Sequence, residues 1–153
     1  MTWPAARIVR GTAVHLDRWS QLRALLWSDG SEAEHRDDIA AMVAHGKGHV
    51  AFLALDVSGD AIGFVEAALR HDYVNGCDTS PVLFVEGLYV EPDARRSGAA
   101  RALIDAVTAW GRAQGCSEMA SDADITNLSS HDFHNALGFL ETERVVYFRK
   151  VIA

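Results

Sequence analysis

Apolar residues recur at two different spacings along the chain, and each spacing predicts its own kind of element. Spacings of three and four residues predict a helix, and Leu16, Trp19, Leu22 and Leu26 follow this pattern. Thr12 stands ahead of this stripe as a candidate N-cap. Ser31 and Glu34 form a capping box that predicts the start of a second helix, and Gly46 or Gly48 is a plausible stop.

Beyond the second helix the pattern changes to short runs rich in β-branched and aromatic residues. Residues 49–57 and 61–69 read as two strands joined by the turn Ser-Gly-Asp, and a polar, turn-rich segment over 70–81 reads as a long loop. Residues 82–90 are almost wholly apolar, as expected for a strand at the centre of a sheet, and Pro92 ends that strand.

The last third of the chain returns to alternating elements. We expect a helix over 97–115 stopped by Gly115, a strand over 117–122, a helix over 127–138 stopped by Gly138, and a final strand over 141–152. With a short strand over 6–11, the order is βααβββαβαβ. This order predicts one α+β domain spanning 1–153, with a mixed, mostly antiparallel sheet flanked by about four helices.

The charge balance is acidic and narrows the choice of partners. The 153 residues carry 14 lysines and arginines against 21 aspartates and glutamates, a formal net charge of −7. Such a surface repels nucleic acid and anionic membranes and favours cationic partners, although acidity also serves solubility alone. No run approaches the length of a membrane span, and the first residues lack the apolar stretch of a signal peptide.

The two cysteines, Cys77 and Cys116, are too few for a disulfide scaffold and are not spaced for a metal site. A bridge between them is not excluded, but free thiols in a reducing cytosol are the simpler interpretation. The histidines also lack metal-ligand spacing, so we expect no metal. Together these features predict a cytoplasmic protein.

The segment Glu-Pro-Asp-Ala-Arg-Arg-Ser-Gly-Ala-Ala-Arg-Ala-Leu, residues 91–103, lies between a predicted strand and a predicted helix. A helix N-terminus carries unpaired N–H groups and partial positive charge, and small residues let a ligand approach them. The arrangement predicts an anion site, usually for phosphate. It lacks both the Gly-Lys-Ser/Thr of a phosphate loop and the third glycine of a dinucleotide fingerprint.

The pattern V-x-P-x-x-R-x-x-G-x-A over 90–100, followed by helix, strand, helix and Ala-Leu-Gly-Phe over 136–139, resembles the GCN5-related N-acetyltransferase superfamily. The resemblance covers almost the whole chain and implies acetyl-CoA as cosubstrate. It implies that the pantetheine arm pairs with a strand end at Leu88, Tyr89 and Val90, and that Asn127 contacts the cofactor. It also implies a pyrophosphate site formed by Arg95, Arg96, Ser97, Gly98, Ala99, Ala100 and Arg101.

Several stretches, loops included, resemble one group within that superfamily, the bacterial aminoglycoside 6'-N-acetyltransferases. They cover residues 25–27, 70–82, 84–90, 118–122 and 136–150. This resemblance implies an antibiotic-resistance enzyme. It also implies a homodimer, because such enzymes are often homodimers, and some of them exchange the last strand between the two copies. It also implies substrate contacts from Trp27, Tyr73, Glu86, Asp122 and Glu143.

These acidic residues suit a sugar that carries several ammonium groups. Carboxylates that converge on a cleft attract such a polycation, and aromatic walls cover the sugar faces. Glu86 is the most informative of them, because a carboxylate inside a strand as apolar as 82–90 is costly to bury unpaired. We therefore expect Glu86 to face a polar cleft.

The expected chemistry is direct attack of an amine on the thioester in a ternary complex. Asp122 is the first candidate for the general base and Glu86 the second. His134 stands where many superfamily members carry a tyrosine and is a candidate acid for the thiolate, as is Tyr147; a helix-surface or supporting histidine is the alternative for His134. A main-chain N–H near Leu88 would meet the oxyanion.

Two other functions fit the same residues. One is an acetyltransferase for another small polyamine or a peptide amine, which an acidic cleft would serve equally well. The other is a non-catalytic acyl-CoA sensor, which needs the arginine-glycine segment but no convergent carboxylates.

Overall fold

The computed structural model describes residues 5–153. The first four residues lie outside this description. The expectation that the chain starts without a signal peptide concerns these residues in part. The strands are β1 Arg7–Arg10, β2 His49–Leu55, β3 Ala61–Arg70, β4 Val82–Val90 and β5 Met119–Ala120. The helices are α1 Leu16–Leu26, α2 Glu32–Ala44, α3 Ala99–Ala113 and α4 Leu128–Ala136, with short 3₁₀ turns at Ala13–His15 and Pro92–Ala94.

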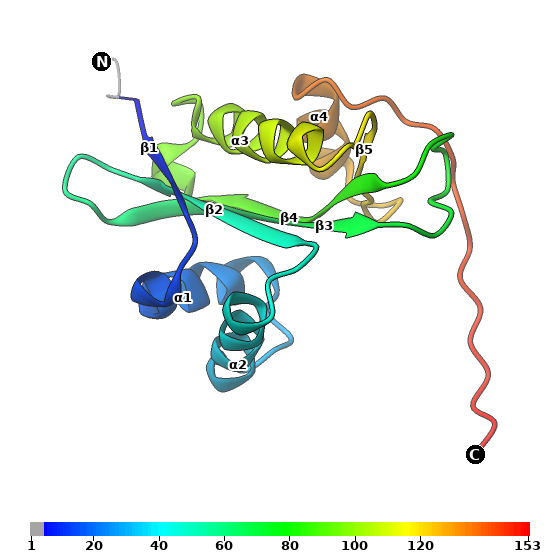
Figure 1. Ribbon diagram of the computed structural model, residues 1–153, viewed down its shortest axis with the longest axis horizontal. Helices are drawn as coiled ribbons and strands as arrows, with labels where there is room; N and C mark the ends of the chain where they lie inside the picture. The colour runs from blue at the N-terminus through cyan, green and yellow to red at the C-terminus, as the bar shows by residue number, and fades with distance from the viewer. Residues whose placement is uncertain (1–4) are drawn as a thin grey trace.

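The five strands form one sheet in the order β1-β2-β3-β4-β5. All neighbouring pairs are antiparallel except β4 and β5, which run parallel. Helices α1 and α2 cover one face, and α3 and α4 lie on the other, as Figure 1 shows. The expected α+β architecture, with a mostly antiparallel sheet and four helices, is thereby confirmed.

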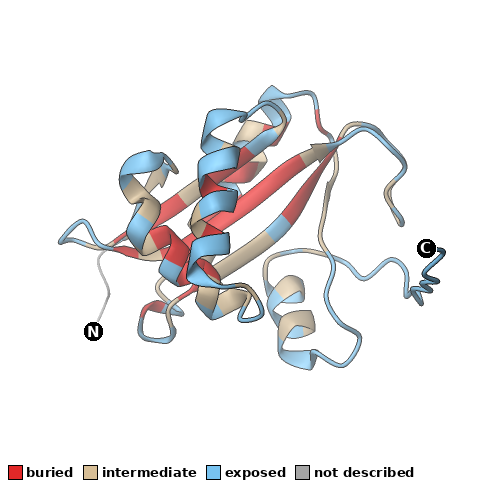
Figure 2. Cartoon of the chain, turned by 90° about the horizontal axis from the view of Figure 1, so that it is seen from below, coloured by how far each residue is buried: buried red, intermediate tan, exposed pale blue. Residues whose placement is uncertain are grey.

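Each face of the sheet has its own apolar core, which Figure 2 shows as buried residues along the strands and the inner sides of the helices. Trp19, Leu22 and Ile39 from the first two helices pack on one face, and Leu103 and Val107 from α3 pack on the other. Alternate strand residues point to opposite faces, so a single strand such as β3 serves both cores.

Local signals place most element boundaries correctly. The Ser31 hydroxyl accepts a hydrogen bond from the Glu34 N–H at 3.1 Å and caps α2. Gly115, at φ +90°, follows the end of α3, as expected for a left-handed stop. Several boundaries differ: a 3₁₀ turn separates Thr12 from α1, α3 begins after Gly98 rather than at residue 97, and β5 spans only Met119–Ala120 instead of 117–122.

The sheet opens on one side of β4. Strand β5 pairs with β4 only through Leu83↔Met119 and Phe84↔Ala120, so the second half of β4 has no strand neighbour on that edge among residues 5–153. On its other edge, β4 stays paired with β3 up to Gly63↔Val90. A stretch of backbone at the end of β4 therefore faces the space between the sheet and α4.

The expectation of a final strand over 141–152 is wrong for a single chain. This segment leaves the body of the molecule beside the β3–β4 loop and has no strand partner within the described residues (Figure 1). Its apolar side chains stay exposed, with Phe148 at 93% and Ile152 at 90%. The alternating pattern favours a strand, but a strand also needs an edge to pair with, and one chain does not provide it.

Two smaller expectations concern thiols and membranes. Cys77 and Cys116 are both free thiols, the second one buried, and burial raises the pKa of each. Within residues 5–153, no helix combines the length and the apolar character needed to cross a membrane.

Candidate functional site

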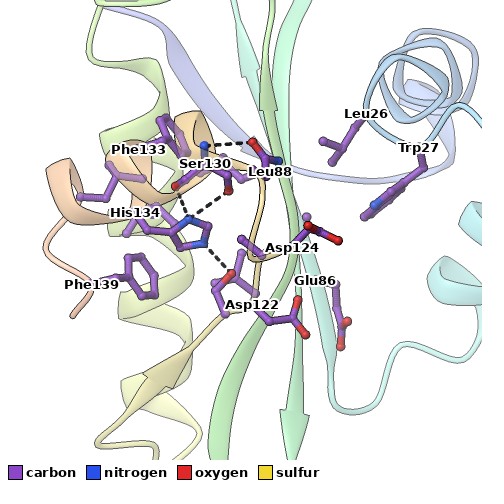
Figure 3. Close-up of a pocket in the computed structure, with 17 residues that line it drawn as sticks. Leu26, Trp27, Glu86, Leu88, Asp122, Asp124, Ser130, Phe133, His134 and Phe139 are labelled. Carbon is purple, nitrogen blue, oxygen red and sulfur yellow. Dashed lines mark hydrogen bonds between the residues drawn. The ribbon is translucent and has the colours of Figure 1, made fainter. Parts of the chain in front are cut away.

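A cavity of about 310 Å³ lies where the chain after β5 separates from β4. Six of the residues selected from the sequence line it together: Trp27, Glu86, Leu88, Asp122, Asn127 and His134. Figure 3 shows that they come from the end of α1, from β4, from the segment after β5 and from α4. The open side of the sheet thus brings together residues up to 107 positions apart in the sequence, from Trp27 to His134.

A β-bulge presents Glu86 to this cavity. Glu66 pairs with Gly87 and Ala67 pairs with Val85, so Glu86 is an extra residue with no partner on β3. The four residues before it are buried, whereas Glu86 is exposed. Its carboxylate accepts a hydrogen bond at 2.9 Å from Arg70, whose guanidinium stacks 3.8 Å from the centroid of Phe84. Glu86 therefore faces a polar cleft, as the sequence indicated.

Asp122 is joined by a second aspartate that the sequence analysis did not select. The carboxylates of Asp122, Asp124 and Glu86 point into the same space, opposite the indole of Trp27 (Figure 3). The Thr126 hydroxyl donates to Asp124 at 2.6 Å and the Thr126 N–H at 2.8 Å, and these bonds lower the pKa of Asp124. Three carboxylates against one aromatic wall suit a ligand with several positive charges.

His134 lies at the back of the cavity, between the rings of Phe133 and Phe139. Its Nδ1 is 2.7 Å from the Ser130 carbonyl, which can only accept, so Nδ1 carries a proton. In the neutral ring, Nε2 then accepts from the Ser121 hydroxyl, 2.8 Å away. Any proton that His134 gives to the cavity leaves through Nε2, and Ser121 stands on that route.

The bend before α3 has the geometry of an anion site. Arg96 adopts φ 64° and Gly98 φ 86°, and such left-handed residues turn successive N–H groups toward one side. A Cβ on Gly98 would meet nothing within 4 Å, so the bend is open. The helical ladder starts with Ala102 N–H donating to the Gly98 carbonyl at 3.0 Å, which leaves earlier amides without a partner one turn back.

Two arginines of this segment are engaged within the chain. Arg95 donates from Nε to the Val90 carbonyl at 2.9 Å and lies against Tyr89, while Arg101 donates to the Ala136 carbonyl at 2.8 Å. These bonds fix the bend to β4 and to α4. The anion site would therefore consist mainly of main-chain N–H groups, with Ser97, Ala99 and Ala100 allowing close approach.

The other residues expected to hold the cosubstrate lie next to this bend. Leu88, Tyr89 and Val90 form the part of β4 whose second edge is open, so an extended ligand can lie along it. Asn127 caps α4 through its side-chain oxygen, 3.2 Å from the Ser130 N–H, which leaves its NH₂ group to donate to a ligand. The residues present therefore fit a ligand with a diphosphate and an extended amide-bearing arm.

Two expected substrate contacts lie outside the cavity in a single chain. Tyr73 is 76% exposed in the loop 71–81, which Glu118 ties down by accepting from the N–H groups of Asp78 and Thr79. Glu143 is exposed in the C-terminal segment. A Cβ on Gly76 would lie 2.1 Å from Thr142 Oγ1, so the segment that carries Glu143 passes directly over the loop that carries Tyr73.

Arg70, Ser121 and Asp124 are the functional candidates that sequence reasoning missed. Asp124 lies two residues beyond Asp122 in a segment with no hydrophobic period, and its only signal was its place after a strand. Arg70 was assigned to a loop, whereas it is the last residue of β3. In residues 5–153, no three histidine, cysteine, aspartate or glutamate side chains gather so as to hold a metal ion.

Comparison with known proteins agrees with this geometry. Residues 16–139 match the model of the acetyltransferase (GNAT) family. Aminoglycoside N(6')-acetyltransferase type 1 of Serratia marcescens is 51% identical over 90% of this chain and 94% of its own length. The protein of the same name from Salmonella typhimurium is 48% identical over 89% of this chain and 92% of its own length.

Solved structures agree as well. AAC(6')-Iy in complex with the bisubstrate analogue CoA-S-monomethyl-acetylneamine superposes with a TM-score of 0.91 at 44% identity, covering 97% of this chain and 100% of that one. AAC(6')-Ih from Acinetobacter baumannii gives a TM-score of 0.92 at 42% identity, covering 97% and 99%. The open β4 edge, the glycine-containing bend and these relatives lead to one conclusion: the chain belongs to the GNAT acetyltransferase family.

Proposed function

We propose that this chain is an aminoglycoside 6'-N-acetyltransferase, acting as one N-acetyltransferase domain over residues 1–153. The observation that carries the proposal is the convergence of Glu86, Asp122 and Asp124 opposite Trp27, beside the open edge of β4. The curated relatives named above share this activity by name, and one related structure holds CoA joined to an acetylneamine.

Acetyl-CoA would bind along the open edge and the bend. Its pyrophosphate would accept hydrogen bonds from the amides around Arg96 to Arg101, and its pantetheine arm would pair with Leu88 to Val90 as an added strand. This placement brings the thioester to the middle of β4. Asn127, whose NH₂ group is left free by its capping role, would donate to the same arm from the other side.

The aminoglycoside would bind in the acidic half of the cavity. Its ammonium groups would meet Glu86, Asp122 and Asp124, and the apolar face of its sugar ring would lie against the indole of Trp27. The pKa of Asp124 is lowered by its bonds from Thr126, so this carboxylate keeps its charge when the solution is mildly acidic.

Acetyl transfer would then proceed by direct attack. The 6'-ammonium gives a proton to Asp122, with Glu86 as second candidate, and the neutral amine attacks the thioester carbonyl. The new C–N bond forms as the C–S bond breaks, and the nitrogen gives up its second proton to water. The thiolate takes a proton by way of Ser121 from His134 in its imidazolium form, in which Nε2 as well as Nδ1 carries a proton. A main-chain N–H near Leu88 would stabilise the oxyanion, and orientation of the two reactants supplies several kcal/mol, about 7 or more in favourable cases.

A thiol-release assay with acetyl-CoA tests the proposal. Wild-type protein should release CoA thiol fast with kanamycin and slowly with spermidine or a short peptide. Asp122→Asn should lower kcat/KM for kanamycin by about 100-fold, in the range of one general-base contribution, with acetyl-CoA affinity unchanged. A preference for spermidine or peptide would indicate the other acetyltransferase function, and no thiol release with any amine would indicate a sensor.

We also propose that the active form is a cytoplasmic homodimer. The C-terminal segment exposes Val146, Tyr147, Phe148 and Ile152 to solvent, and β5 ends the sheet with a free outer edge. A second copy of this chain could cover the segment and accept it as a strand. Pairing would also fix Glu143 and the Tyr73 loop near a cavity that in one chain lacks both.

A further inference from the structure

Trp27 is held from several sides, although it is the last, half-buried residue of the α1 region and borders a cavity. The guanidinium carbon of Arg23 lies 4.8 Å from the centroid of its indole, and the ring of Phe64 meets it edge-on at 5.9 Å. Its main-chain carbonyl accepts a hydrogen bond from His35 Nε2 at 2.9 Å. Arg23 can only donate, so its bond to His35 Nδ1 leaves the ring proton on Nε2.

The guanidinium under the indole is itself fixed by a buried ion pair. Arg23 donates to Glu66 at 2.5 Å and to Asp38 at 3.1 Å, and the Trp19 indole N–H donates to Glu66 at 2.9 Å. Burial raises the pKa of Glu66 despite the attraction of Arg23, so removal of Arg23 would leave a buried, unpaired carboxyl group. Arg23 is therefore unsuitable for a clean mutational test.

Gly87 contacts the indole of Trp27 from the side of β4, and the absence of a side chain at Gly87 leaves room for the ring. It pairs with Glu66 across the sheet, on the face that α1 covers. A Cβ at Gly87 would lie 2.3 Å from Trp27 Cζ2, 2.5 Å from Cη2 and 3.0 Å from Leu26 Cδ2. Gly87 is not among the glycines with positive φ, so its backbone conformation does not by itself require a glycine. The indole, and not the turn of the chain, requires a glycine at this position.

The bulge gives this contact its functional meaning. Glu86 is the extra residue of β4 and points into the cavity, while Gly87, the next residue, supports the ring that faces Glu86. Displacing the indole by the thickness of one methyl group changes its distance from the three carboxylates across the cavity. The gap matters for a sugar ring, which must lie flat on the indole while its ammonium groups reach the carboxylates.

We infer that Gly87 is a positioning residue that sets substrate specificity: by lacking a side chain it seats the indole of Trp27 against β4 and so fixes the distance between this aromatic wall and the carboxylates that an aminosugar must reach. This inference rests on the proposed function, because it takes Trp27 as a wall of the aminoglycoside site. It assigns to Gly87 no contact with either substrate.

A double-mutant cycle of Gly87→Ala and Trp27→Ala tests the inference by steady-state kinetics. Gly87→Ala should raise the KM for kanamycin about tenfold, the equivalent of 1.4 kcal/mol, and leave the KM for acetyl-CoA unchanged. In the Trp27→Ala background, the same substitution should have little effect, because no indole remains to be displaced. Equal effects in both backgrounds, or no effect in either, would overturn the inference.

Gly111→Ala is the matched control. A Cβ at Gly111, in α3, would lie 2.8 Å from Leu83 Cδ2, so it crowds the core as Gly87→Ala does but does not reach the cavity. It should lower the melting temperature without changing the kanamycin KM. Near-ultraviolet circular dichroism should change in Gly87→Ala only while Trp27 is present. The circular dichroism measurement does not depend on activity. If the wild type fails to acetylate aminoglycosides, the proposed function is wrong, and the spectra still test whether Gly87 positions the indole.

Discussion

Glu86 already has a cation beside it, the guanidinium of Arg70. The Arg70 side chain is 45% exposed and that of Glu86 38%, and their N–O distance is 2.9 Å. Exposed pairs of this kind contribute about 1 kcal/mol at most. An incoming ammonium group can therefore share or displace the arginine at little cost.

Arg70→Met keeps most of the apolar stem over Phe84 and removes the competing charge. We expect the kanamycin KM to fall by about two- to fivefold, in line with the strength of an exposed pair. Arg36→Met is the control, because Arg36 forms an equivalent exposed pair with Asp17 on the first two helices. A rise in KM for Arg70→Met alone would mean that the arginine orients Glu86 for the substrate rather than competing for it.

The element that holds the anion site is the start of α3, and its two ends offer a matched comparison. Gly98→Asp should weaken CoA binding by at least about tenfold, since the new carboxylate occupies the opening and repels the pyrophosphate. Gly115→Asp places the same side chain at the other end of α3, at a similar φ of +90° against +86° and also with open space. The helix dipole favours an acidic residue at residue 98 and disfavours one at 115, so loss of stability cannot explain the expected order.

Isothermal titration with CoA measures this difference. Affinity should fall for Gly98→Asp and stay within about twofold of wild type for Gly115→Asp, since an exposed charge far from the ligand is screened by salt. If both variants bind CoA like the wild type, the pyrophosphate lies elsewhere.

Elements with local signals were predictable from the sequence, and those that depend on distant partners were not. The capping box of Ser31 and the glycine after α3 act within a few residues, so they place α2 and the end of α3. Strand β5 is only two residues long because β4 leaves it, and this separation is a property of the whole sheet. Glu86 was found because an acidic residue in an apolar strand is conspicuous. The contact of Gly87 with Trp27 joins two elements 60 positions apart in sequence, and no local pattern contains it.

At the scale of the whole molecule, the exposed C-terminal segment is the part of the chain on which the proposed dimer depends. Wild-type protein should sediment as a dimer, and Phe148→Glu should shift it toward the monomer, because a charge in an apolar contact is costly to bury. Val57→Glu is the control: Val57 is also apolar and 82% exposed, but it lies in the β2–β3 turn. The monomeric variant should also have a higher kanamycin KM, since Glu143 would no longer be held near the cavity. A wild type that sediments as a monomer at enzyme-assay and micromolar concentrations would contradict the proposed dimer.

Because half of β4 is unpaired, the stability of the folded protein depends on the concentration of acetyl-CoA in the cell. A ligand that completes the sheet stabilises the folded chain, by about 2.7 kcal/mol when its concentration is 100 times its dissociation constant. When acetyl-CoA becomes scarce, each enzyme molecule catalyses fewer acetylations. The protein also unfolds more often, so proteases degrade it faster. A starved cell would then lose acetylating capacity faster than the fall in acetyl-CoA alone implies.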